Sequence, residues 1–575
     1  MRVKTLRFFF IILFVGLFGC LFYLQIIKGP FYKNLSYRNS IRLLNINSPR
    51  GIIYDRFTQK LAYNVLSFSV FIVPQEVVDI DSEIKELSKI LGVRESLLRR
   101  NYKRNYYAPF APCELMRDVS KEKAILTEEL RLDMPGVLVK EVPLRMYPYK
   151  EAFLHLVGYM GEIDRRELKL LKSYGYNIKD LIGKDGIERV ADDDLRGRSG
   201  GRQVQVDNMG HQVKVLSFKG PKRGKDVYLT VDAGLQSFLW KMMEGKKGAA
   251  IFMDPNNGEI LALVSSPSHD PNVPLTDEVL SDLDAPLLNR AIMGQYPPGS
   301  LFKILISAGG LESGVIDSET SFVCRGTLDV GIEEFGCWNR DGHGPMKLND
   351  AIVESCNVYF YNTGIRLGLE RIYEYARKLG FGKKTGIELF GEMEGFLPSR
   401  AWKKIKRKEN WYAGDTANLS IGQGYLLVTP LQVVRMVASV ANGGKLIRPH
   451  VFLESDLNRV SEARPLKSEE NIELIKKGLK GVVEDEDGTG IQAWSELVSI
   501  SGKTGTTQTG EEFKTHAWFG GFAPSDNPEI SFVIFLEHGG SGGDDAALMA
   551  GKAVEYWYKS KTTVPRMARG AKKEL

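Results

Sequence analysis

The chain opens with a long apolar run. Residues 8–27 (FFFIILFVGLFGCLFYLQII) carry no charge and are flanked by Arg7 and Lys28. At about 1.5 Å per residue, a helix of this length spans the roughly 30 Å hydrocarbon core of a bilayer. A cleaved signal peptide would have a shorter apolar stretch followed by a small-x-small cleavage site, and no such site follows. The pattern predicts a retained single-pass membrane anchor in residues 1–28, with the basic residues before it favouring a cytoplasmic N-terminus.

Residues 29–224 form a basic zone rich in strands and turns. Residues 48–64 have the pattern of extended chain, a turn and a strand, and residues 82–93 carry apolar positions at the three- and four-residue spacing of a helix. This zone contains no cluster of potential catalytic groups. We therefore expect an elongated, non-catalytic pedestal domain of mixed structure, suited to spacing or docking.

The pattern changes near residue 225. Residues 227–232 predict a strand, residues 234–244 an amphipathic helix, and residues 248–267 a β-hairpin around a Pro-Asn-Asn-Gly turn. Next come a helix-rich middle, three strands and a last helix, at residues 285–480, 496–508, 516–524, 529–539 and 544–559. Strands at both ends with helices between them predict an α+β domain over residues 225–560, whose antiparallel sheet is assembled from both ends. A basic tail, residues 561–575, follows.

Composition limits the possible functions. The chain has 575 residues, 43% hydrophobic and 26% charged, which is ordinary globular composition for two or three domains. Lys and Arg number 77 against 71 Asp and Glu, and the net charge of +6 is too dilute to indicate a nucleic-acid partner. Five cysteines in a chain this long do not form a disulfide scaffold.

A Ser-x-x-Lys motif at Ser300–Lys303 supplies a candidate nucleophile and base. Two prolines and a glycine precede Ser300 and a helical pattern follows, so the serine is expected in a first helical turn with free backbone N–H groups. Lys303 shares that helix face, and burial would lower its pKa so that it could act as general base. The same motif at 82–85 and 120–123 begins charged helices, where serine is an ordinary N-cap.

A Ser-x-Asn motif occurs at Ser355–Asn357. Two residues so spaced can both face a cleft only where a helix is interrupted or at a turn between helices. We expect Ser355 to relay a proton and Asn357 to bind a substrate amide. The second match, at 525–527, precedes a proline between two strands and is typical of a turn.

A Lys-Thr-Gly motif occurs at residues 503–505 in a strand pattern. Thr504 and Thr506 lie on one face of a strand, so both hydroxyls could reach one carboxylate, with Lys503 as the cation. The backbone N–H groups of Thr506 and Ser300 could together form an oxyanion hole. Another match, at 384–386, follows a helix ending in glycine and predicts a connecting loop.

Four potential metal ligands occur close together in the chain: Cys324, Cys337, His343 and Cys356. Three thiolates and one imidazole complete the tetrahedral set of a structural zinc, with no open position for catalysis. The loop at 322–346 is rich in glycine and charge, so a metal would give it order. A Cys324–Cys337 disulfide with Cys356 as a buried thiol is the alternative, and unlinked residues are the third possibility.

The order PPGSLFK, SCN and SGKTGT resembles the penicillin-binding and serine β-lactamase superfamily. Five further segments resemble signatures of the class B high-molecular-weight members of this superfamily. They are RGIIYDR, GKDGIE, LTVDAGLQ, DPNNGEILALVSSP and LSIGQGYLLVTPLQ, at residues 50–56, 183–188, 229–236, 254–267 and 419–432. The resemblance covers nearly everything after the anchor. It implies a short cytoplasmic tail, one anchor, a dimerisation-type pedestal and a transpeptidase domain on the outer, periplasmic side of the cytoplasmic membrane.

The resemblance also implies a reaction. Ser300 would attack the penultimate carbonyl of a stem peptide ending in D-Ala-D-Ala, expel the last D-Ala, and pass the acyl group to an amine of a neighbouring stem. β-Lactams would acylate the same serine, and the chemistry requires no cofactor. The elongation-type members resemble the chain most; they work with a SEDS-family polymerase of the RodA type and other elongation-complex proteins. Zinc-bearing elongation members have a site in the region of the cysteines, which favours zinc here.

Other functions share part of this pattern. Division-type class B transpeptidases carry most of the same motifs. A β-lactamase would need a residue that activates deacylating water, and would have little use for an anchor and a large N-terminal domain. A non-catalytic β-lactam sensor usually has several membrane spans and an output domain. A pure scaffold would not need all three motifs, so the pattern favours a serine transpeptidase.

Overall fold

A computed structural model of the chain describes residues 2–46, 48–130, 134–176, 180–206, 212–453, 463–508 and 515–563. They divide into two compact units. The first comprises residues 1–51, 64–146 and 193–225, and the second residues 52–63, 147–192 and 226–575. Each unit is thus built from separate stretches of chain, whereas the predicted domains, with boundaries at residues 28, 224 and 560, are continuous and stay a prediction.

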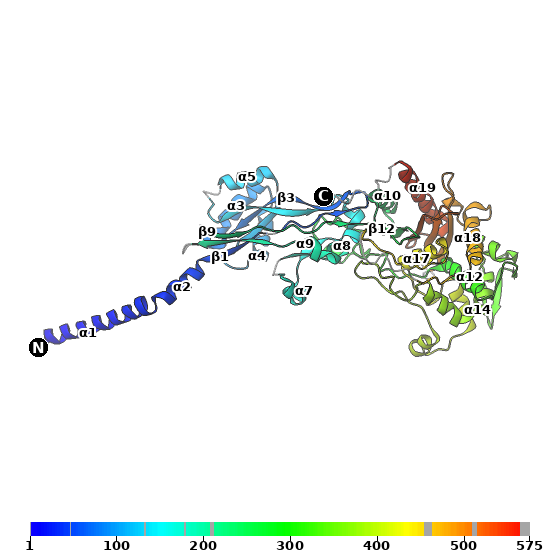
Figure 1. The fold of residues 1–575 in the computed structure, drawn as a ribbon, viewed down its shortest axis with the longest axis horizontal. Coiled ribbons are helices and arrows are strands. Elements are labelled where there is room, and N and C mark those ends of the chain that lie inside the picture. The colour runs from blue at the N-terminus through cyan, green and yellow to red at the C-terminus, as the bar shows by residue number, and fades with distance from the viewer. Residues whose placement is uncertain are drawn as a thin grey trace. The chain divides into compact units, whose positions relative to one another are not determined.

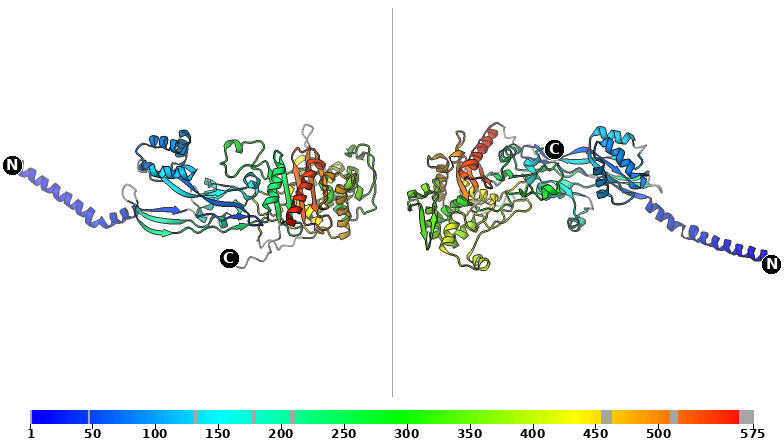
Figure 2. Two further views of the ribbon diagram at one scale, coloured as in Figure 1. Left: turned by 90° about the horizontal axis from the view of Figure 1, so that it is seen from above. Right: turned by 180° about the vertical axis from the view of Figure 1, so that it is seen from behind.

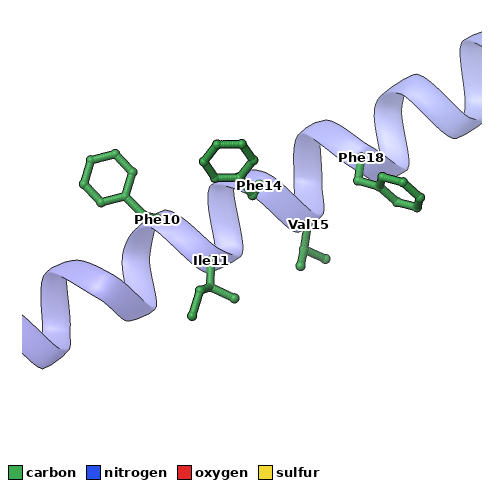
Figure 3. A pocket seen from close by; sticks show the side chains of 5 residues that line it. All are labelled: Phe10, Ile11, Phe14, Val15 and Phe18. Carbon is green, nitrogen blue, oxygen red and sulfur yellow. The ribbon is translucent and has the colours of Figure 1, made fainter.

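The apolar run forms the helix α1 (Arg2–Phe22), which the π-helical turn η1 (Tyr23–Ile27) continues (Figure 1). Mean hydropathy within Val3–Ile27 reaches 2.5, and none of that window is buried in protein. Figure 3 shows apolar side chains projecting from this helix, namely Phe10, Ile11, Phe14, Val15 and Phe18. A helix with twenty consecutive uncharged residues, 8–27, and without protein around it fits a single-pass membrane anchor.

The first unit combines two sheets with a group of helices. One sheet has three antiparallel strands in the order β1-β8-β9, and in the other β3 pairs with β4 and β5. The strands are β1 (Ile41–Ile46), β3 (Lys60–Ile72), β4 (Cys113–Val119), β5 (Val137–Met146), β8 (Gly200–Val206) and β9 (Gln212–Lys219). The helices are α2 (Gly29–Asn39), η2 (Pro74–Glu76), α3 (Ile80–Leu91), α4 (Glu95–Asn105), α5 (Lys121–Glu129) and, largely, α9 (Asp192–Arg196).

The helix predicted at 82–93 is confirmed as α3. The Asp79 side chain caps it by accepting a hydrogen bond from the Asp81 N–H, and Gly92 ends it at a left-handed φ of 65°. Its apolar face includes Ile84 and Leu87, which pack against the sheet in a buried core.

The second unit is organised around a five-stranded antiparallel sheet in the order β12-β11-β19-β18-β17 (Figure 1, Figure 2). Its strands are β11 (Gly248–Met253), β12 (Ile260–Ser266), β17 (Ser501–Thr507), β18 (His516–Ala523) and β19 (Ile530–Leu536). Strands from both ends of the domain pair directly, since β11 lies between β12 and β19. The predicted hairpin and the predicted sheet are therefore confirmed.

Helices cover both faces of this sheet. On one face, α10 (Ala233–Met243) and α19 (Ala547–Thr563) pack together, and their apolar residues share a core with Phe252 and Phe532. On the other face α17 (Pro430–Ala441), buried along its whole length, contacts β11, β18 and β19. Every residue of β11, β12, β18 and β19 is consequently buried. β12 and β17 form the two edges of the sheet, and each pairs with one strand of it.

Shorter elements complete the second unit. The helices are η4 (Lys150–Phe153), α6 (Leu154–Val157), α7 (Arg165–Leu171), η5 (Lys172–Tyr174), α8 (Gly186–Val190), α11 (Asp277–Leu280), η6 (Gly299–Phe302), α12 (Lys303–Glu312), α13 (Leu348–Val353), α14 (Asn357–Lys378), α15 (Arg400–Trp402), η7 (Lys403–Arg407), α16 (Ala413–Ser420), α18 (Glu469–Glu484), η9 (Ile491–Ala493) and η10 (Gly542–Ala546). The strands are β2 (Ile53–Tyr54), β6 (Met160–Glu162), β7 (Leu181–Gly183), β10 (Val227–Tyr228), β13 (Phe322–Cys324), β14 (Thr327–Val330), β15 (Glu333–Gly336) and β16 (Gly344–Met346). The strand expected at 227–232 is only the two-residue β10, and the helix-rich middle also holds β13–β16.

A buried ion pair fixes the chain just before the Ser-x-x-Lys motif. Arg290 Nε lies 2.9 Å from Glu537 Oε1, and the two side chains are 4% and 16% exposed. The Tyr296 hydroxyl donates to the same oxygen at 2.5 Å. Glu537, at the end of β19, thus holds two side chains that precede Ser300.

Replacing Glu537 by Ala should lower the free energy of unfolding by about 3–5 kcal/mol, because it leaves the Arg290 guanidinium buried without a counter-charge. Denaturant unfolding of the purified protein measures the effect. Glu529→Ala is the matched control: its partner Lys561 is about a third exposed, and such pairs contribute roughly 1 kcal/mol or less. Equal losses in the two variants would contradict the assignment.

Candidate active site

Ser300 lies in the 3₁₀ turn η6, which leads directly into α12. Gly299 makes the turn possible: its φ of 55° is left-handed, and a Cβ there would lie 2.5 Å from Thr507 Cγ2. Ser300 is half-buried, and its hydroxyl has no hydrogen-bond partner in the described part of the chain. The serine therefore stands at a helix start, as predicted, with its hydroxyl available.

Lys303 is 1% exposed, at the first position of α12. Its ammonium donates to the Ser355 carbonyl at 2.8 Å, the Ser355 hydroxyl at 3.2 Å and Asn357 Oδ1 at 2.7 Å. Because all three acceptors are neutral, burial dominates and lowers the pKa of Lys303 to about 8. These two described residues form no hydrogen bond with each other, and the reach of Lys303 to the Ser300 hydroxyl stays a prediction.

Ser355 and Asn357 lie at a sharp turn between α13 and α14. Ser355 has a φ of 53°, a left-handed conformation that residues with a side chain rarely adopt. This turn directs the carbonyl and hydroxyl of Ser355 and the amide of Asn357 toward one ammonium. It is the interruption between helices that the two-residue spacing required.

Lys503 lies on the edge strand β17 and is fully buried. Within the described residues, the hydrogen bonds of its Nζ go to its neighbour Thr504 alone, at 3.4 Å to Oγ1 and 3.5 Å to the carbonyl. Burial, with a smaller contribution from nearby Lys303, holds its pKa well below the usual range. Among the described residues no carboxylate pairs with either lysine. Two buried amines without a counter-ion form a site that an anionic group would complete.

Thr504 and Thr506 form side-chain hydrogen bonds with residues that lie outside the strand. The Thr504 hydroxyl donates to Thr489 Oγ1 at 2.9 Å, and the Thr489 hydroxyl donates to the Val353 carbonyl at 3.3 Å. Thr506 is exposed, and its Oγ1 accepts a hydrogen bond from the Gly542 N–H at 3.2 Å. Thr489 therefore links β17 to the end of α13. Sequence reasoning missed Thr489, whose only signal was the Asp-Gly-Thr-Gly loop at 487–490.

The backbone of β17 runs beside the turn of the nucleophile. A Cβ on Gly505 would lie 3.1 Å from the Pro298 carbonyl, and one on Gly299 would lie 3.3 Å from the Thr506 carbonyl. The Trp518 indole N–H donates to the Pro297 carbonyl at 3.1 Å. The strand and the turn are thus in close contact, which the predicted oxyanion hole requires; the hole itself stays a prediction.

The four potential metal ligands meet next to this site. The ligand atoms of Cys324, Cys337, His343 and Cys356 all lie within 4.8 Å of one another. His343 Nδ1 is 3.4 Å from Cys324 Sγ and 3.6 Å from Cys337 Sγ, and every cysteine is free. Cys337 Sγ also accepts a hydrogen bond from the Asn357 N–H at 3.3 Å. The cluster therefore contacts the turn that holds Lys303.

The chemistry of the cluster suits a metal. The Cys356 thiol hydrogen-bonds Cys337 and lowers the pKa of that thiol, which favours the thiolate form that binds metals. His343 is 1% exposed; its Nε2 is buried without a hydrogen-bond partner among described residues and lies 3.9 Å from the Glu354 carboxylate. A carboxylate behind a metal-binding histidine is a common supporting contact.

The competing motif matches lie elsewhere. Ser82 is exposed on α3, and Ser120 caps α5 by accepting from the Lys123 N–H. Ser525 lies in the turn between β18 and β19. Thr385, in the loop after α14, donates to the Glu392 carboxylate. Each has the structural role that its local sequence predicted.

Comparison with known proteins agrees with this geometry. Residues 248–555 match the penicillin binding protein transpeptidase domain, and residues 45–229 match the penicillin-binding protein dimerisation domain. The chain belongs to the penicillin-binding protein transpeptidase family. The predicted family, and the α+β fold with an N-terminal apolar helix, are thereby confirmed.

Similar proteins cover nearly the whole length of this penicillin-binding protein. Peptidoglycan D,D-transpeptidase MrdA of Haemophilus influenzae is 33% identical over 97% of the chain and 91% of that protein. MrdA of Escherichia coli is 31% identical over 95% of the chain and 93% of that protein. Among solved structures, Helicobacter pylori PBP2 in complex with MreC covers 90% of the chain and 100% of that chain, with a TM-score of 0.80 and 29% identity.

Acylation of this penicillin-binding protein should depend on pH through Lys303. The amine can accept a proton only in its neutral form, whose fraction rises as the pH passes its pKa of about 8. The second-order rate constant for acylation by a fluorescent penicillin should therefore rise from about pH 6 to 8 and level off above about pH 9. Lys303→Arg, which stays protonated throughout, should acylate at a small fraction of that rate at every pH. A flat wild-type profile would exclude Lys303 as the base.

Proposed function

We propose that this chain is a peptidoglycan D,D-transpeptidase of cell-wall elongation and that Ser300 forms its acyl-enzyme. The convergence of Ser355 and Asn357 on the buried amine of Lys303, one turn after Ser300, carries this proposal. Such an arrangement supplies a base of lowered pKa beside a free hydroxyl at a helix start. The similarity to MrdA proteins supports the elongation role over a division role.

The first half of the reaction makes the acyl-enzyme. When Lys303 is neutral, its nitrogen has two N–H groups and one lone pair. It can then keep only two of its three hydrogen bonds to Ser355 and Asn357, and its lone pair can accept the Ser300 proton. Ser300 Oγ then attacks the penultimate carbonyl of a stem peptide ending in D-Ala-D-Ala. The N–H groups of Ser300 and Thr506 stabilise the oxyanion. The C–N bond breaks, the Ser355 hydroxyl relays a proton to the leaving amine, and the last D-Ala departs.

The second half transfers the acyl group. An amine of a neighbouring stem peptide attacks the ester carbonyl and loses a proton to the neutral Lys303. The C–O bond to Ser300 then breaks, and Lys303 returns the proton to Ser300 Oγ. Asn357 binds the amide of the donor peptide. Before acylation, the terminal carboxylate of the donor is bound by Lys503, Thr504 and Thr506. This carboxylate supplies the counter-ion that the two buried lysines lack. β-Lactams, which present a carboxylate and a strained amide, enter the same way, and no step requires a cofactor.

The substrate sets the orientation in the membrane. Stem peptides lie outside the cytoplasmic membrane, so the second unit belongs on the outer, periplasmic side and α1 serves as its single anchor. The H. pylori relative was solved in complex with MreC, which supports elongation-complex proteins as partners here. A SEDS-family polymerase of the RodA type would meet this chain inside the bilayer, where α1 offers the exposed apolar side chains shown in Figure 3.

We further propose a structural zinc held by Cys324, Cys337, His343 and Cys356. The four ligand atoms lie close enough to surround one ion, and Zn²⁺ prefers sulfur and imidazole ligands. The metal would tie β13, β15 and β16 together and would hold Cys337 against the Asn357 N–H. It would support the Ser355–Asn357 turn without taking part in the reaction.

Replacing Ser300 by Ala should abolish covalent labelling by fluorescent penicillin and release of D-Ala, because no other hydroxyl stands at this helix start. The variant should melt at the wild-type temperature, since the Ser300 hydroxyl makes no hydrogen bond in the described structure. Ser82→Ala, from the exposed rival motif, is the control and should label normally. Labelling that persists in Ser300→Ala refutes the assignment. A wild-type adduct that turns over within seconds would indicate a β-lactamase, and no adduct at all would indicate a scaffold.

Protein purified without chelator should contain about one zinc per chain by elemental analysis, and Cys356→Ser should lose it. Cys113→Ser, which changes a buried cysteine of the first unit, should keep the metal. A metal-free but fully active protein with Cys324 linked to Cys337 by mass spectrometry would replace zinc with a disulfide.

A further inference from the structure

A cavity of about 300 Å³ lies in the second unit beside the turn that carries Ser300. The side chains that shape it are Trp411, Asp415, Asn418, Gln423 and Tyr425. The carbonyl of Gly422, one residue before Gln423, accepts a hydrogen bond from the Gly299 N–H at 3.0 Å. A Cβ on Gly422 would lie 2.2 Å from the Gly299 carbonyl. The cavity wall and the turn of the nucleophile are therefore in direct backbone contact.

Part of the wall is fixed by its own contacts. Asp415 accepts hydrogen bonds from Lys403 Nζ at 2.8 and 2.6 Å and from the Tyr412 N–H at 2.8 Å. The Trp411 indole N–H donates to Thr416 Oγ1 at 2.8 Å. Tyr425 packs edge-on against Trp402. Asp415 is thus already satisfied, and the two rings present apolar faces in fixed positions.

The amides of Asn418 and Gln423 are different. Both residues are half-buried, and in the part of the chain that the structure describes neither side-chain amide has a hydrogen-bond partner. Each amide offers a donor and an acceptor. Two unused amides beside a fixed aromatic wall match a ligand that itself contains peptide bonds, which donate and accept in the same way.

The chain that leads into the cavity is strongly basic. Residues 404–408 include four exposed basic residues: Lys404, Lys406, Arg407 and Lys408. The next residue, Glu409, is acidic. The Arg407 guanidinium lies 5.3 Å from the centre of the Tyr425 ring. Arg407 thus places a positive charge beside the cavity, and the basic residues next to it in sequence strengthen the attraction for anionic ligands; we call these four residues the basic rim.

We propose that this cavity is a subsite for the donor stem peptide and takes a carboxylate-bearing part of the peptide upstream of the two terminal D-alanines. The proposal rests on the function proposed above, because it requires a peptide whose end lies at Ser300. The upstream peptide bonds pair with Asn418 and Gln423, the apolar part of the side chain lies against Trp411 and Tyr425, and free carboxylates face the basic rim. The subsite gives the enzyme a preference for long donors over short ones.

Two donors with the same D-Ala-D-Ala end test this, using the full-length protein in detergent. One is a complete stem pentapeptide, and the other carries an acetyl group in place of the upstream residues. For Asn418→Ala and Gln423→Ala we expect kcat/KM for D-Ala release to fall about tenfold with the pentapeptide, which corresponds to loss of one or two hydrogen bonds. The truncated donor and penicillin labelling should be unaffected. Asn410→Ala, an exposed asparagine outside the cavity, is the matched control.

Binding gives a readout that does not need turnover. Calorimetry with the pentapeptide and Ser300→Ala protein should show Kd about tenfold higher when Asn418→Ala is added. Equal losses with both donors, or no loss with either, would overturn the subsite. A loss that depends on the sugar of the donor and not on its peptide length would replace the peptide with a glycan. Failure of the proposed function looks different: wild-type protein would release no D-Ala from either donor, while the calorimetric comparison would still decide the subsite.

Discussion

The burial of Lys303 is the constraint on which the catalytic half of the molecule depends. An ammonium at 1% exposure has lost its water and needs other acceptors in its place. Those acceptors are the Ser355 carbonyl and hydroxyl and the Asn357 amide, which meet only because Ser355 adopts a left-handed φ. That conformation costs about 1–3 kcal/mol, whereas each hydrogen bond to a charged group contributes roughly 1.5–3 kcal/mol. The ammonium therefore keeps the strained turn in place.

The same turn is supported from two further directions. Thr489 joins the Val353 carbonyl, just before the turn, to Thr504 on the edge strand. Cys337 accepts the N–H of Asn357, just after the turn. The sheet, the helix of the nucleophile and the cysteine cluster are thus fastened at one place in the chain. Few independent movements are left to the groups that must align for acyl transfer.

Local pattern was enough to predict the main elements and to choose among repeated motifs. The hairpin at 248–267 and the strand before Lys503 have strong alternation or apolar runs, and Ser300 differs from Ser82 by the Pro-Pro-Gly turn that precedes it. The strands β13–β16 were missed because each is only three or four residues long. The roles of Thr489 and Gly422 depend on packing between distant segments, which no local pattern contains. The hydrogen-bond acceptors of the Lys303 ammonium were missed for the same reason, since they lie some fifty residues away in the chain.

The order of strands in the five-stranded sheet has a consequence for biosynthesis. The inner strand β11 is made early but receives its second neighbour, the central strand β19, only when almost the whole chain has emerged. Ser300 is synthesised long before β17, so no chain that ends before residue 501 can place Ser300 beside this edge strand. Pairings so distant in sequence form slowly. The site around Ser300 is thus complete only after all five strands of this sheet have been synthesised.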